Sequence, residues 1–239
     1  QQLASIGRLA AEIAHEINNP LAVVLTYIRL MLKLIVRQRF TRGRLEDINR
    51  YLTTMEEEVS FCGEIVKNLL AFARQSKIEM KPNSIGKIID KVFLLISHDL
   101  ELRGIQVFSD VEEDLPAVNC DFKQIQQALL NVLNNAAEAM TEGGILSLQA
   151  YRSGKDGFIE VAITAPGHGI SAEDQKEIFE PFFTTKEEGK GVGLGLAVAY
   201  GIITRHEGTI EVESPPADGE NQYGSRFLIR LPISARGKD

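Results

Sequence analysis

A histidine, a carboxylate and an amide lie close together near the start of the chain, in the stretch AEIAHEINNPL. His15 is followed directly by Glu16, and Asn19 comes about one helical turn later. Side chains three and four positions apart are neighbours on a helix, so the three groups share one location. A carboxylate beside an imidazole can orient the ring and take its proton, which makes the imidazole a nucleophile. Pro20 removes a backbone donor and should bend the helix just beyond this group.

This group belongs to a long helical pattern. Apolar residues recur every three or four positions between residues 6 and 32, which indicates an amphipathic helix. His15 lies off the centre of that apolar stripe, so we expect its side chain at the edge of the stripe or in solvent. A lone histidine on a helix is more often an ordinary surface residue. The reactive interpretation therefore needs support from the rest of the chain.

The sequence HEINNPL, preceded by GRLAAEIA, resembles the phosphoacceptor box of the sensor histidine kinases of two-component systems. The resemblance implies that His15 accepts a phosphoryl group while Glu16 orients the ring and withdraws its proton. The spacing of Glu16 and Asn19 also resembles the phosphatase motif of these kinases. In that role Asn19 would position the water that hydrolyses the phospho-aspartate of a regulator.

Two long helices are expected in the first third of the chain. Residues 1–36 and about 45–76 both carry apolar stripes at helical spacing, and the basic stretch between them contains Gly43. Two such helices joined by a short turn form an antiparallel hairpin. One hairpin cannot cover both stripes, so we expect a homodimer in which two hairpins form a four-helix bundle. Packing of the stripe against the following domain is the alternative.

The rest of the chain is expected to form an α/β domain with helices against one mixed sheet. We expect the hairpin to occupy residues 1–76, a polar linker with a short strand residues 77–84, and the second domain residues 85–239. Helices are expected over about 85–104, 121–140 and 195–206, with a short one near 172–179. Strands are expected over 105–111, 145–152, 158–165, 210–213 and 225–231. The stretch EEDLPAVNC between two of these elements is expected to be a loop.

The helix QIQQALLNVLNNAAEAM carries two asparagines, Asn131 and Asn135, four positions apart on one face. Asparagine is uncommon in helix interiors, and its amide oxygen suits Mg²⁺. Solvated asparagines are the ordinary alternative. The helix resembles the N box of the ATPase superfamily that includes histidine kinases and gyrase. The resemblance implies that Asn135 ligates Mg²⁺ and that Asn131 lies beside the triphosphate of ATP.

A glycine-rich stretch, GKGVGLGLAVAYGI, opens the last helix. Gly191, Gly193 and Gly195 permit close approach of the backbone, and a helix start presents free N–H groups to phosphate. The stretch follows no strand and lacks the P-loop pattern, which excludes both common nucleotide-binding motifs. Together with FEPFFTTK it resembles the F and G2 boxes that flank the ATP lid of histidine kinases. Lys186 and Lys190 are then candidates to meet phosphate, and solvated loop lysines are the alternative.

The stretch ITAPGHGI occupies the place of the G1 box, which reads Asp-x-Gly-x-Gly in the family. Gly167 and Gly169 are present, but Ala165 stands at the aspartate position. In the family that aspartate accepts a hydrogen bond from the amine of adenine, and alanine cannot. Losing a hydrogen bond of about 1.5–3 kcal/mol predicts nucleotide affinity lower by at least about 10–100-fold. We expect Ala165 to be an engineered substitution rather than the mark of a natural pseudokinase, because the other motifs are intact.

Composition sets limits on the class of protein. The 239 residues are 44% hydrophobic and 25% charged, and the net charge of -7 argues against a nucleic-acid partner. The two cysteines and four histidines have no metal-ligand spacing; Cys62 is expected in the hairpin, Cys120 in a loop, and His206 as structural or solvated. No apolar run approaches the roughly 20 residues of a membrane span, and we expect no signal peptide. The few, widely spaced cysteines predict a reducing, cytoplasmic compartment. The chain begins inside a helical pattern without Met, so we expect a fragment whose membrane contact would come only through a missing upstream region.

These motifs occur in the order found in sensor histidine kinases and cover nearly the whole chain. The resemblance implies an α plus α/β protein: a dimerising two-helix hairpin followed by a GHKL-type α/β sandwich that binds ATP. It implies phosphorylation of His15 by Mg-ATP and transfer to an aspartate in the receiver domain of a response regulator. Two alternatives stay open. The first is a chaperone or mismatch-repair ATPase of the same superfamily, although such proteins lack the His-Glu helix. The second is a non-enzymatic dimeric scaffold that binds a regulator without ATP.

Overall fold

The computed structural model describes residues 2–36, 42–73, 78–154, 157–186, 193–216 and 224–234. They belong to two compact units. The first unit comprises residues 1–74 with 184–192, and the second comprises residues 75–183 with 193–239. No helix in these described ranges is long and apolar enough to cross a membrane.

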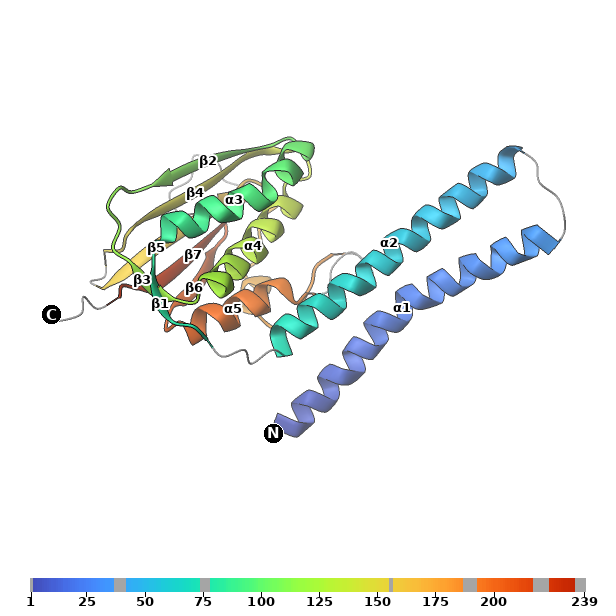
Figure 1. Cartoon of the computed structure of the whole chain (residues 1–239), viewed down its shortest axis with the longest axis horizontal. Helices are drawn as coiled ribbons and strands as arrows, with labels where there is room; N and C mark the ends of the chain where they lie inside the picture. The colour runs from blue at the N-terminus through green and yellow to red at the C-terminus, as the bar shows by residue number, and fades with distance from the viewer. Residues whose placement is uncertain are drawn as a thin grey trace. The chain divides into compact units, whose positions relative to one another are not determined.

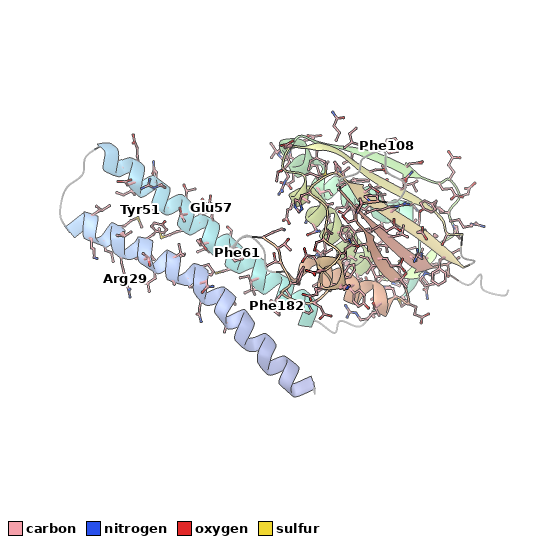
Figure 2. The ribbon with its side chains drawn as sticks, turned by 180° about the vertical axis from the view of Figure 1, so that it is seen from behind. Arg29, Tyr51, Glu57, Phe61, Phe108 and Phe182 are labelled. Carbon is pink, nitrogen blue, oxygen red and sulfur yellow. The ribbon has the colours of Figure 1, made fainter. Side chains whose placement is uncertain are left out.

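The first unit contains the expected helical hairpin. Helix α1 (Gln2–Val36) and helix α2 (Arg42–Ala73) lie side by side (Figure 1). Tyr51 lies between the helices and stacks on Tyr27, with ring centroids 5.0 Å apart (Figure 2). Ile65 is completely buried. The expected turn lies largely in residues 37–41, outside the described residues.

Each helix of the hairpin leaves a row of apolar side chains uncovered, between 39% and 55% exposed. They are Leu21, Leu25, Ile28 and Leu32 on α1 and Leu45, Leu52, Val59 and Val66 on α2. The α1 positions alternate in steps of four and three, and the α2 positions recur every seven residues. This is the period of a coiled-coil seam, which packs against further helices. We call these eight side chains the open stripe.

The second unit is built on a five-stranded sheet of order β2-β4-β5-β7-β6. Its strands are β2 (Ile105–Val111), β4 (Gly144–Arg152), β5 (Phe158–Ala165), β6 (Thr209–Glu213) and β7 (Ser225–Pro232). β2 and β4 run parallel and the other pairs antiparallel. Helices α3 (Ile85–Leu102), α4 (Phe122–Ala139) and α5 (Gly195–Arg205) cover one face of the sheet (Figure 1). The expected α/β sandwich is confirmed.

Two local expectations were wrong. The stretch expected as a loop contains β3 (Val118–Cys120), which pairs antiparallel with β1 (Lys81–Asn83) in a separate two-stranded sheet. A three-residue strand is too short to show an alternating pattern, so only its partner reveals it. The short helix expected near residues 172–179 is a 3₁₀ turn, Asp174–Lys176.

Alternation along β5 separates the two faces of the sheet. Ile159, Val161 and Ile163 are completely buried toward the helices. On the opposite face Glu160 accepts hydrogen bonds from Arg230, at 2.8 Å, and from Tyr151, at 2.9 Å. The polar network therefore covers the face without helices, and the helix-covered face is left for the core and the candidate site.

Candidate active site

The two asparagines of α4 differ in their bonding. Asn131 Nδ2 donates to Gly195 O at 2.9 Å, and Asn131 Oδ1 accepts from Gln127 Nε2 at 2.8 Å. Asn131 thereby ties α4 to the first residue of α5. Asn135, one turn further along, is half-buried and makes no hydrogen bond within the described residues. The amide of Asn135 is therefore available to a ligand, while that of Asn131 is already committed to the fold.

The start of α5 is held by backbone contacts that require glycine. Gly193 has φ +65°, and a Cβ there would lie 2.5 Å from the backbone of Phe182 and Phe183. Phe182 N–H also donates to Gly193 O at 3.0 Å. Because no side chain caps α5, its first N–H groups can meet an anion.

Two of the predicted lid residues cannot be placed. Lys190 and Gly191 fall within residues 187–192, outside the described part of the chain. Lys186 is the last described residue before this gap, and it is exposed. Gly193 and Gly195 are described on the other side.

Ala165 is the last residue of β5 and is only 3% exposed. It lies on the same strand face as Val161 and Ile163, toward the helices. The loop that follows packs closely on its surroundings: a Cβ on Gly167 would lie 3.0 Å from Ala139 O at the end of α4. Residue 165 and the glycines of this loop therefore lie on the side of the sheet that carries Asn135.

A set of hydrogen bonds that the sequence did not indicate fixes this loop. Gln175 Nε2 donates to Ile170 O at 2.9 Å and to Ser214 O at 2.8 Å. Ser214 Oγ accepts from Ile170 N–H at 2.8 Å and donates to Gly224 O at 2.6 Å. Gly169, with φ +74°, leaves room for the Ser214 hydroxyl, which a Cβ would approach to 3.0 Å. No sequence signal points to Gln175 or Ser214, because Ser214 comes 39 residues after Gln175 in the chain.

These elements give one side of the second unit an amide oxygen, an uncapped helix start and a glycine loop. Such a set suits a phosphorylated ligand with a magnesium ion, because Mg²⁺ takes few protein ligands and completes its shell with phosphate oxygens and water. The described residues contain no group of three or more His, Cys, Asp or Glu side chains that could hold a metal by themselves. A separate hollow of about 420 Å³ between β1 and the first turn of α4 contains none of the candidate residues.

The predicted phosphoacceptor group lies on α1. The backbones of His15 and Glu16 are helical, but their side chains lie outside the described residues. Asn19 is exposed, and α1 continues through the buried Pro20.

Other residues singled out in the sequence have structural surroundings. Burial raises the pKa of the Cys120 thiol to about 11, and Cys120 belongs to β3 rather than to a loop. Cys62 is half-buried in the hairpin, where burial and the charge of Glu58 raise its pKa. His206 is completely buried, while His98 and His168 are exposed.

Comparison with known families agrees with this arrangement. Residues 5–77 match the His Kinase A (phospho-acceptor) domain, and residues 120–235 match the Histidine kinase-, DNA gyrase B-, and HSP90-like ATPase. The two matched ranges cover most of the chain in the order of a kinase core. The chain belongs to the sensor histidine kinases.

Its similarity to individual histidine kinases extends over the full chain. It is 31% identical to the signal transduction histidine-protein kinase AtoS of Escherichia coli over 99% of this chain and 36% of the relative. It is 33% identical to the sensor histidine kinase ZraS of Salmonella typhimurium over 100% of this chain and 48% of the relative. The chain thus spans about a third to a half of the length of these curated relatives.

A solved structure shows the same two-part architecture. Histidine kinase ThkA, crystallised in complex with response regulator protein TrrA, aligns with a TM-score of 0.75 and 25% identity. The alignment covers 98% of this chain and 63% of the ThkA chain.

Proposed function

We propose that this chain forms a kinase core in which Mg-ATP phosphorylates His15, and from which the phosphoryl group passes to an aspartate of a response regulator. The order of the parts supports this most directly. A helix carrying His15 and Glu16 precedes an ATPase domain whose α4 presents an uncommitted Asn135. The ThkA–TrrA complex supports a receiver domain as the partner. ATP and such regulators are cytoplasmic, which supports the same location for this core.

The residues of the proposed nucleotide site have separate roles. The triphosphate lies along α4 and the start of α5, where backbone N–H groups and the helix dipole favour negative charge. Asn135 would hold Mg²⁺, which would neutralise phosphate charge. Asn131 sets the position of Gly195 beside the triphosphate through its hydrogen bond. Gly167 and Gly169 shape the loop beside the base, and Lys186, Lys190 and Gly191 belong to the lid.

On α1, one imidazole nitrogen of His15 attacks the γ-phosphorus with its lone pair, and ADP leaves. Glu16 takes the proton from the other ring nitrogen, so the phosphorylated imidazole is neutral rather than cationic. Asn19, exposed one turn away, positions water for hydrolysis of the phospho-aspartate of the docked regulator.

The open stripe supports a homodimer. Eight apolar side chains at coiled-coil spacing are uncovered in a single hairpin, and a second hairpin supplies the matching surface. The four-helix bundle built in this way is also the surface on which a receiver domain docks.

Ala165 weakens the kinase reaction of this chain but leaves the phosphatase reaction intact. Residue 165 lies on the strand face toward the helices and cannot accept a hydrogen bond from a base. Asn19 and the hairpin need no contact with residue 165. A dimeric scaffold that binds a regulator without ATP is the alternative that Ala165 leaves open.

Labelling with γ-³²P-ATP tests the proposal. The Ala165→Asp variant should incorporate phosphate, the unsubstituted chain much less, and the double variant with His15→Gln none. Labelling that survives His15→Gln would assign the phosphoacceptor to another residue, and no labelling of Ala165→Asp would favour the scaffold.

The phosphatase role is tested separately. A panel of receiver domains phosphorylated with acetyl phosphate should lose phosphate faster with the unsubstituted chain than with Asn19→Ala. Asn18→Ala, an exposed neighbour, is the control. Equal rates for Asn19→Ala and the unsubstituted chain would remove Asn19 from the mechanism.

A further inference from the structure

Helices α4 and α5 run antiparallel, and a hydrogen bond joins each end of α5 to α4. Asn131 Nδ2 donates to Gly195 O at the start of α5, and Asp121 N–H donates to His206 Nε2 just after its end, at 3.0 Å. The two attachment points are ten residues apart on α4 and eleven apart on α5. At a rise of 1.5 Å per residue these spacings are about 15 and 16.5 Å, and because they nearly match, both bonds can form at the same relative position of the two helices. Together they fix how far α5 can slide along α4.

The His206 ring is held in one tautomer. It is completely buried, and Nδ1 lies 2.8 Å from Ile202 O, a carbonyl that can only accept. Nδ1 therefore carries the hydrogen, and Nε2 accepts from Asp121 N–H. One side of the ring bonds to α5 itself, and the other side bonds to the start of α4.

The two bonds of the ring are not equally replaceable. Ile202 O also accepts from His206 N–H at 3.2 Å, so it keeps a partner if Nδ1 is removed. Asp121 N–H, on a half-buried residue, loses its acceptor if Nε2 is removed, and a donor left without a partner away from water is costly. The peptide of Asp121 is itself fixed, because its side chain caps α4 by accepting from Lys123 N–H at 3.0 Å and Gln124 N–H at 3.2 Å.

We propose that His206 is a positioning residue for the nucleotide-binding end of α5. It acts through Asp121 and α4, and it determines where Gly195 and the first N–H groups of α5 lie relative to Asn131 and Asn135. Its effect on nucleotide affinity rests on the proposed function, whereas its effect on the register of α5 does not.

Two variants of the full chain separate the two bonds of the ring. The amide of His206→Gln reaches the place of Nε2 and can still accept from Asp121 N–H. The amide of His206→Asn reaches only the place of Nδ1 and leaves Asp121 N–H without its acceptor. In NMR spectra without nucleotide, the Asn131 side-chain amide and the Gly195 amide should keep their shifts in His206→Gln and change in His206→Asn.

Nucleotide affinity gives the second readout. In the Ala165→Asp background, calorimetry with Mg-ATP should give a Kd about tenfold higher for His206→Asn, the size of one lost hydrogen bond, and within about twofold for His206→Gln. The rate at saturating ATP should be unchanged, because His206 acts on how tightly the start of α5 holds the nucleotide and not on the phosphoryl transfer itself.

Equal behaviour of the two variants, in shifts or in Kd, would overturn the proposal. If Ala165→Asp itself binds no Mg-ATP, the proposed function fails while the shift comparison still decides the role of His206. If His206→Asn does not fold, the scalar coupling across the hydrogen bond from Asp121 N to His206 Nε2 in the unsubstituted chain decides instead. Its presence with the Nδ1–H tautomer supports the proposal, and its absence overturns it.

Discussion

An aspartate in place of Ala165 should make the unliganded chain less stable and its nucleotide complex tighter. Residue 165 is 3% exposed, so without ligand the new carboxylate is buried. An unsatisfied buried polar group costs about 1–3 kcal/mol and a charged one more, and a domain of this size loses about 2–4 °C in Tm per kcal/mol. We therefore expect Tm to fall by at least about 2 °C in the absence of nucleotide.

With nucleotide present, tighter binding opposes this loss of stability. A hydrogen bond to a charged acceptor contributes about 1.5–3 kcal/mol, which lowers the Kd for Mg-ATP by about 10–150-fold. Because a ligand that binds only the native state stabilises it by RT ln(1 + [L]/Kd), the Tm gained on adding Mg-ATP should be larger for Ala165→Asp than for the unsubstituted chain. Calorimetry and thermal unfolding with and without Mg-ATP measure the two effects.

Two matched substitutions show whether position and charge matter. Thr164→Asp places the same carboxylate on the opposite face of β5 and should leave the Kd unchanged. Ala165→Asn supplies an uncharged acceptor and should recover part of the affinity. The reasoning is refuted if Ala165→Asp binds Mg-ATP no more tightly than the unsubstituted chain, or if Thr164→Asp tightens binding equally.

Three further predictions follow from the surroundings of single residues. Val59→Glu, on the open stripe, should make the chain monomeric in sedimentation equilibrium while the exposed neighbour Ser60→Glu stays dimeric; a dimeric Val59→Glu would exclude this stripe as the interface. Burial works to raise the pKa of Glu160, but hydrogen bonds from Arg230, Tyr151 and Ser153 outweigh it and lower the pKa. The ionised Glu160 side chain therefore stabilises the fold fully at pH values above its unfolded pKa of about 4.3. This stabilisation is lost as pH falls through the lower pKa of the folded state, so Glu160→Gln should make Tm fall less steeply as the solution is acidified. An equally steep fall of Tm with acidification in Glu160→Gln and the unsubstituted chain would contradict the stabilising role of these hydrogen bonds to Glu160. Because burial raises the pKa of Cys120 to about 11, a thiol reagent at pH 8 should label it in a Cys62→Ser chain only after unfolding, and fast labelling of the native chain would contradict its burial.

The long helices could be predicted closely because each buries one face. The expected helix over 121–140 is α4 (Phe122–Ala139), with Asp121 as its cap. The open stripe could also be predicted, because both helices carry more apolar positions than one hairpin can cover. β3 could not be predicted, since its partner β1 lies more than 30 residues away in sequence and neither strand is long enough to show a pattern.

The candidate site was predicted as a set of motifs but not as a set of contacts. The spacing of Asn131 and Asn135 placed both on one face, yet it could not show that Asn131 is committed to Gly195 while Asn135 is not. His206 was one of four histidines without metal-ligand spacing, and nothing in the sequence separated it from the exposed His98 and His168.

The sequence by itself determined what depends on near neighbours in the chain: the helical periods, the His15-Glu16 pair, and the glycines at 167, 169 and 193. Helical period and backbone conformation are local, so they are written in residues a few positions apart. Tertiary structure alone decided which residues far apart in the chain form hydrogen bonds with one another. The Asn131–Gly195 and Asp121–His206 hydrogen bonds join residues 64 and 85 positions apart, and they form only when the packing of α4 against α5 brings the four groups together.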